Sequence, residues 1–83
     1  MSEIRKFRVL YFGLLAERRG LANEQIASTA STPADLYAEL NTAHALGLST
    51  EHFRVAVNDE FAAWDVEISD GDSVAFLPPM SGG

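Results

Sequence analysis

The chain of 83 residues contains no cysteine, and this absence restricts its chemistry before any motif is considered. It excludes disulfides, thiolate metal sites and a cysteine nucleophile, so any sulfur chemistry has to involve a group other than a side-chain thiol. The only histidines, His44 and His52, show no metal-ligand spacing. We therefore expect both histidines at the surface and no bound metal.

Long hydrophobic runs are also missing. No apolar stretch approaches the roughly 18 residues that a membrane helix needs, and no hydrophobic signal core follows residues 1–6. We expect a cytoplasmic protein that makes no contact with a membrane. The chain length and an apolar content of 47% fit one small globular domain.

Basic residues are scarce after residue 50, where seven acidic residues accompany Arg54 alone. Residues 1–50 carry five acids and five bases, so the net charge of −6 arises in the second part of the chain. Such a charge repels phosphate backbones, which argues against nucleic acid as a partner, and it would attract a basic protein surface. The alternative is a solvated acidic face that maintains solubility.

No catalytic motif compensates for the missing thiol. None of the seven serines lies in a nucleophile elbow, and Gly13 alone does not make a phosphate-binding loop after the first predicted strand. Asp70-Gly71-Asp72 lacks the further oxygen donors of a calcium loop, so we interpret it as a turn. Taken alone, the domain has no catalytic machinery.

The first part of the chain has the pattern of a hairpin interrupted by a helix. Residues 7–12 carry large apolar side chains on both faces, which predicts a strand inside a sheet. Residues 14–19 are helix formers that end in two arginines and Gly20, a typical helix end. Residues 24–30 then form a weaker strand, which we expect to pair with the first.

A long helix follows, and its start is well marked. Thr32 is a good N-cap residue and Pro33 suits the first helical position. We expect the helix to run to about Ala45 and to end at Gly47. Apolar residues at spacings of three and four predict its buried stripe: Leu36, Leu40, Ala43 and either Leu46 or Leu48.

The rest of the chain has the pattern of strands and tight turns. Residues 53–57 alternate as a strand, Asn58-Asp59 is turn-forming, and residues 60–64 lead back as a short strand or extended segment. The turn at 70–72 precedes a last strand over 73–77. This order predicts an α+β β-grasp (ubiquitin-like) fold. A mixed sheet of four to five strands wraps one long helix, a short helix follows strand 1, and the first and last strands lie parallel at the centre.

The C-terminus is the most distinctive segment. Pro78 and Pro79 cannot continue a sheet, so we divide the chain into a domain over 1–77 and a flexible tail over 78–83. An extended tail of that length reaches roughly 20 Å. It ends on Gly82-Gly83, which have no side chains and pass easily into a narrow pocket. A glycine-rich end without any function is the alternative.

The terminal carboxylate of Gly83 is the group that remains for chemistry. It is an anion at neutral pH, because the pKa of such a group is about 3.3 to 3.7. Adenylation would convert it to a mixed anhydride, and attack by sulfide or persulfide would then give a thiocarboxylate. We therefore expect a covalently loaded carrier whose catalysts are its partners.

Three segments carry a resemblance to a known family: 9–17 (VLYFGLLAE), 55–58 (VAVN) and 70–83 (DGDSVAFLPPMSGG). Together they resemble the MoaD-type sulfur carriers, the small subunits of molybdopterin synthase. The resemblance implies a ubiquitin-like β-grasp and a Gly83 that is adenylated and converted to a thiocarboxylate. The sulfur is then delivered to cyclic pyranopterin monophosphate to build molybdopterin. Met80 stands where the family often has valine.

The resemblance also implies partners and site residues. Gly83 is the acyl position and Gly82 the slender residue before it, and the partner contact comprises Phe76, Leu77, Pro78, Pro79, Met80 and Ser81. The implied partners are the large synthase subunit, an ATP-dependent adenylating enzyme of the E1 type and a sulfur donor protein. The chain itself binds no cofactor, and ATP serves the activating partner.

The resemblance further implies a heterotetramer with a dimeric large subunit, in which that subunit is catalytic and this chain is a non-catalytic donor. Arg18 and Arg19 receive no role. Two other functions stay open: a sulfur carrier of another pathway, such as thiamine synthesis or tRNA thiolation, and a non-covalent β-grasp interaction module.

Overall fold

The computed structural model describes residues 3–78. Its elements follow the chain in this order: β1 (Arg5–Tyr11), α1 (Leu14–Arg19), β2 (Asn23–Ser28), α2 (Pro33–His44), the short 3-10 helix η1 (Thr50–His52), β3 (Arg54–Val57), β4 (Glu60–Ala62) and β5 (Ser73–Leu77). Neither α1 nor α2, the α-helices of the described part of the chain, has the length and apolar character of a membrane span.

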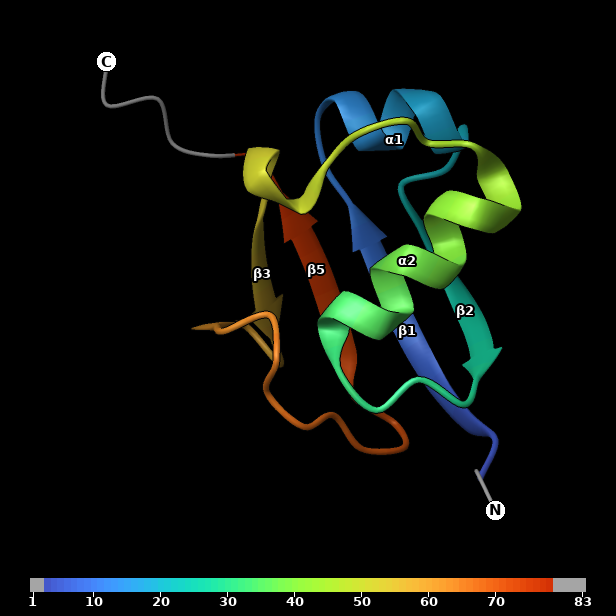
Figure 1. Cartoon of the computed structure of the whole chain (residues 1–83), viewed down its shortest axis with the longest axis vertical. Coiled ribbons are helices and arrows are strands. Elements are labelled where there is room, and N and C mark those ends of the chain that lie inside the picture. The colour runs from blue at the N-terminus through green and yellow to red at the C-terminus, as the bar shows by residue number, and fades with distance from the viewer. Residues whose placement is uncertain (1–2, 79–83) are drawn as a thin grey trace.

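The five strands form one mixed sheet with the order β2-β1-β5-β3-β4. β1 and β5 pair in parallel, with Val9 opposite Val74, whereas the other pairs are antiparallel. Figure 1 shows α2 lying across one face of this sheet. The predicted β-grasp is confirmed, including the parallel first and last strands and the place of β1 inside the sheet.

β1 shows why the sheet has one core face. Its alternate residues Phe7, Val9 and Tyr11 are buried under α2, while Lys6 and Arg8 are exposed on the other side. Successive side chains of a strand point to opposite faces of the sheet, so the pairing register of β1 determines which of its residues enter the core.

The start of α2 agrees with the prediction, and its buried stripe differs from it. The Thr32 hydroxyl accepts a hydrogen bond from the Asp35 amide at 3.1 Å, and Pro33 occupies the first turn. The helix ends at His44, where Ala45 adopts the left-handed conformation (φ 51°), earlier than the expected stop at Gly47. The prediction that Ala43 is buried was wrong, because the buried stripe of α2 consists of Pro33, Leu36, Tyr37 and Leu40 and leaves Ala43 exposed. Leu46, which follows the helix, is buried as predicted.

Tyr37, which is absent from the predicted stripe although it lies three residues before Leu40, takes a central place in the core. Its ring packs edge-on against Phe76, with centroids 5.3 Å apart, and against Trp64. The Tyr37 hydroxyl donates to the Leu48 carbonyl oxygen at 2.6 Å, so the polar end of the side chain is satisfied. Burial raises the pKa of this phenol.

The two predicted turns are confirmed, and they lie side by side at the start of β5. Asn58 and Asp59 both have positive φ (52° and 70°), as a two-residue hairpin turn of type I′ requires. The Asn58 side chain donates to Asp72 and accepts from the Ser73 amide, both at 3.0 Å. β4 is shorter than predicted, because the Trp64 carbonyl already turns away to accept from Ala34 of α2.

Candidate functional site: the end of β5 and the open face of the sheet

The domain ends where β5 leaves the sheet at Leu77, and Pro78 follows as an exposed residue. Pro78 lies beside Gly13 in the turn between β1 and α1, where a Cβ on Gly13 would be 3.5 Å from the Pro78 Cγ. Because β1 and β5 are parallel neighbours, their C-terminal ends lie at the same end of the sheet. The last described residue is therefore held against a turn from the other end of the sequence.

The structure places the predicted partner residues in two different environments. The Phe76 side chain is fully buried and stacks on Trp64, with centroids 5.8 Å apart, so it belongs to the domain core and presents nothing to a partner. Leu77 is half-buried and points to the opposite side of the sheet. Pro79, Met80, Ser81, Gly82 and Gly83, which make up the rest of the proposed tail over 78–83, lie outside the described residues.

An apolar surface covers part of the side of the sheet that α2 leaves open, the side on which Lys6 and Arg8 are also exposed. Strand pairing aligns four outward residues in one row, because Leu10 pairs with Ala75, Ala75 with Ala56, and Ala56 with Phe61. Phe61 is 66% exposed and Phe12 41%, which is high for such large apolar groups. We call the following set the apolar sheet face: Leu10, Phe12, Ala56, Phe61, Ala75 and Leu77.

Two hollows indent this surface. One of about 260 Å³ lies over the aligned row and is bordered by Asp59. The other, of about 410 Å³, lies between Phe12, Phe61 and Leu77 and extends to Gly13, Arg54 and Pro78. The larger hollow therefore opens where the chain leaves the sheet. Sequence reasoning missed Phe61 and Phe12 as surface residues; the alternation of residues 54–57 was the signal that could have placed Phe61 outward.

Unlike Asp59, the two aspartates that precede β5 lie away from this site. Asp70 and Asp72 stand directly before β5, whose opposite end is the exit of the chain, and the loop over 63–72 lies at that far end in Figure 1. There the Lys6 amide donates to the Asp70 carboxylate at 2.6 Å and Arg5 donates to the Ile68 carbonyl. These two contacts use a backbone amide and a backbone carbonyl, so neither is an ion pair, and the loop over 63–72 lies away from the exit.

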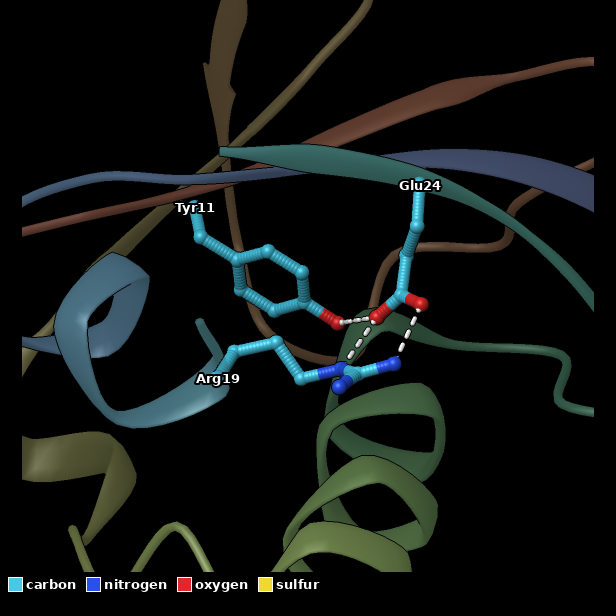
Figure 2. Close-up of polar contacts among 3 residues, drawn as sticks. All are labelled: Tyr11, Arg19 and Glu24. Atoms are coloured by element: carbon cyan, nitrogen blue, oxygen red, sulfur yellow. Dashed lines mark hydrogen bonds and ion pairs between the residues drawn. The ribbon is translucent and has the colours of Figure 1, made fainter. Parts of the chain in front are cut away.

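A polar cluster fixes α1 near the exit (Figure 2). The Glu24 carboxylate accepts a hydrogen bond from the Tyr11 hydroxyl at 2.6 Å and two from the Arg19 guanidinium at 2.7 Å each. The hydrogen bonds from Arg19, the largest cause, hold the pKa of Glu24 below its usual value. Burial, followed by the bond to Glu24, raises the pKa of Tyr11. These groups satisfy one another, so we assign the cluster to the fold.

Arg18 and Arg19, to which the sequence assigned no role, thus connect α1 to other elements of the fold. Arg19 joins α1 to β2 through Glu24, and Arg18 donates to the Leu46 carbonyl oxygen at 2.7 Å, joining α1 to the segment after α2. His52 is exposed and His44 half-buried. Within residues 3–78, no group of three or more histidine, aspartate or glutamate side chains is placed to hold a metal ion.

The parallel central strand pair, the single long helix and the exit beside β1 define a ubiquitin-like β-grasp domain. The model of the ThiS family matches residues 9–83, and the chain belongs to that family. The molybdopterin synthase sulfur carrier subunit of Escherichia coli (strain K12) is 33% identical over 79 residues, which cover 92% of this chain and 98% of that protein. The resemblance to MoaD-type carriers is confirmed.

Solved structures show the same fold. Small archaeal modifier protein 1 of Haloferax volcanii superposes with a TM-score of 0.78 at 26% identity, covering 92% of this chain and 99% of that one. A complex of subunits 1 and 2 of the molybdopterin-converting factor from Helicobacter pylori contains a chain that matches with a TM-score of 0.65 at 26% identity, over 94% and 99%.

Proposed function

We propose that the chain is the sulfur-carrier subunit of a molybdopterin synthase. The observation that carries the proposal is the 33% identity to the Escherichia coli sulfur carrier subunit over nearly all of both chains. In this proposal Gly83 is the acyl position and Gly82 keeps its approach narrow. The Gly83 thiocarboxylate gives its sulfur to cyclic pyranopterin monophosphate.

The chemistry requires two steps before transfer. A carboxylate oxygen of Gly83 attacks the α-phosphorus of ATP on an adenylating partner, and pyrophosphate leaves. The terminal sulfur of a persulfide on a donor protein then attacks the acyl carbon and AMP leaves, which gives an acyl disulfide. A second thiol of the partner proteins attacks the donor cysteine sulfur of this disulfide, forms a new disulfide with it and releases the Gly83 thiocarboxylate. The domain supplies no catalytic group to these steps; its part is to present the terminus.

We further propose that the large synthase subunit docks on the apolar sheet face, with Leu77 and Pro78 at its border. Three observations support this: the exposure of Phe61 and Phe12, the hollow of about 410 Å³ at the exit, and the two-subunit complex of the Helicobacter pylori relative. Phe76 is left out of the contact because its side chain is buried. The proposed assembly is two carriers on a dimeric large subunit.

Intact mass spectrometry tests the proposal. Protein incubated with the adenylating enzyme, ATP and a sulfur source should gain the mass of one oxygen-to-sulfur exchange, and the loaded carrier should support molybdopterin formation by the large subunit. Deletion of Gly83, or one residue added after it, should abolish both results without changing the unfolding transition. Product formation by either variant would contradict the proposal.

The likeness to a small archaeal modifier protein favours a second candidate, a carrier whose activated terminus is joined to amines of other proteins. The same incubation distinguishes the two candidates. Isopeptide-linked conjugates in the presence of ATP, with no thiocarboxylate and no molybdopterin formation, would favour the modifier. A carrier for another sulfur pathway would form the thiocarboxylate and still fail with the large subunit.

A further inference from the structure

Arg54 is a cation set into the apolar sheet face next to the exit of the chain. It begins β3 and pairs with Leu77, the last residue of β5. Its side chain is exposed and faces outward, since its neighbour Val55 faces the core. Arg54 lines the hollow of about 410 Å³ together with Phe61 and Pro78. It also lines a third hollow, of about 240 Å³, beside Trp64.

The guanidinium group of Arg54 is held in place and has no anionic partner within residues 3–78. Its central carbon lies 5.7 Å from the centre of the Phe61 ring, a cation–π distance. The ion pair found in the described part of the chain joins Arg19 to Glu24, and no hydrogen bond there uses the Arg54 side chain. Asp59 borders the hollow of about 260 Å³ and follows the end of β3 opposite to Arg54.

Docking of an apolar surface on this face would remove water from Arg54. A guanidinium that loses water without gaining an acceptor is strongly destabilising, whereas one that meets a carboxylate gains charge-assisted, often bidentate hydrogen bonds. Arg54 stands between Phe61 and Leu77, so a partner that covers these residues must also cover Arg54. The partner surface therefore has to supply an acceptor at this point.

We infer that Arg54 is a specificity residue: the protein that docks on the apolar sheet face places an aspartate or glutamate carboxylate against its guanidinium. The inference rests on the proposed function, because the docking partner is taken to be the large synthase subunit. A partner with an apolar surface but no carboxylate at this point would be rejected by the unpaired cation. Arg54 thus sets which partner binds, while Phe61, Phe12 and Leu77 supply the apolar contact.

The test compares the affinity of carrier variants for the large subunit at low and high salt. Arg54→Gln should weaken binding about 10-fold and Arg54→Glu about 100-fold or more, since the latter brings two like charges together. The salt dependence of binding should be smaller for Arg54→Gln than for the wild type, because one screened charge pair is gone. Arg54→Lys should recover part of the loss.

Arg8→Glu is the matched control, because Arg8 is exposed on the same face of the sheet, away from both hollows that Arg54 lines. It makes the same change in net charge and should alter the affinity less than about 3-fold. Equal binding by wild type, Arg54→Gln and Arg54→Glu would overturn the inference and leave the proposed function standing. A loss for Arg54→Gln with unchanged salt dependence would also overturn it, since the acceptor would then be uncharged. If the wild type itself fails to bind the large subunit, the proposed function is contradicted.

Discussion

At the scale of single residues, Glu24 shows how this small domain uses a charge to hold its structure. Its carboxylate receives three hydrogen bonds from Tyr11 and Arg19, and its side chain is only 14% exposed. The lowered pKa means that the folded protein favours the ionised carboxylate more than the unfolded chain does. The cluster therefore adds stability above the ordinary pKa of glutamate, and this contribution is lost as the pH falls through the folded-state pKa.

We predict that Glu24→Gln lowers the free energy of unfolding by about 1 to 2 kcal/mol at pH 7, because charge-assisted hydrogen bonds become neutral ones. The difference from the wild type should shrink as the pH is lowered below about 4.3, the usual glutamate value. Urea unfolding followed across this range measures both effects. Glu17→Gln, in the exposed part of α1, is the control and should show neither. A Glu24→Gln effect that stays constant down to low pH would contradict the prediction.

At the scale of secondary-structure elements, the turn between β1 and α1 connects the start of the chain to its exit. Gly13 has φ 59° and ψ −132°, a region closed to residues that carry a Cβ. This conformation directs α1 away from β1 and leaves room for Pro78 beside the turn. A methyl group at Gly13 would be in ordinary contact with Pro78, so any cost of a substitution arises from the backbone.

We predict that Gly13→Ala lowers the stability by about 1 to 3 kcal/mol, the usual cost of a strained backbone conformation. Gly20→Ala is the matched comparison, because Gly20 also has positive φ (79°) but lies in the left-handed helical region. It should cost about 1 kcal/mol. Denaturant unfolding of both variants measures the difference. Equal costs would show that the unusual ψ of Gly13 imposes no constraint of its own.

The N-cap of α2 gives a second prediction at this scale. Thr32→Ala removes the acceptor for the Asp35 amide and should lower the stability by about 1 kcal/mol, while Thr32→Ser, which keeps the hydroxyl, should cost much less. Thermal unfolding of the two variants provides the measurement. Identical losses for alanine and serine would mean that the hydroxyl contributes nothing as a cap.

At the scale of the whole molecule, the two faces of the sheet and its two ends have separate tasks. One face packs on α2, and the other carries the apolar sheet face. One end holds the exit of the chain, and the other holds the acidic loop over 63–72. The expectation that the acidic half of the sequence attracts a basic protein surface stays a prediction.

We predict that Phe61→Ser changes the stability by no more than about 0.5 kcal/mol, as is usual for exposed positions, but weakens binding to the large subunit at least about 10-fold. The double variant Asp65→Asn with Glu67→Gln, in the acidic loop, should leave that affinity within about 3-fold, because the loop over 63–72 lies at the far end of the sheet. Titration calorimetry of the wild type, Phe61→Ser and the double variant with the large subunit measures the three affinities. Strong weakening by the acidic-loop variant would show that long-range attraction matters after all.

The sequence by itself determined the elements whose signals are local. α1 and β5 have the predicted bounds, because Gly20, Pro78 and the turn at 70–72 act on their immediate neighbours. The cap at Thr32 is equally local. The order of these elements was sufficient to predict the β-grasp, since a parallel first and last strand around one helix is what that order allows.

Only the tertiary structure decided which side each residue faces and what lies next to it. Phe76 and Leu77 are adjacent and both apolar, yet one is core and the other borders the partner surface, because α2 covers a single face of the sheet. Tyr37 is buried and Ala43 exposed although both lie three residues from the buried Leu40, so spacing within the helix alone does not decide which residues meet the sheet. Arg54 and Leu77 become neighbours through a strand pairing between distant parts of the chain, and local patterns do not determine the register of such a pairing.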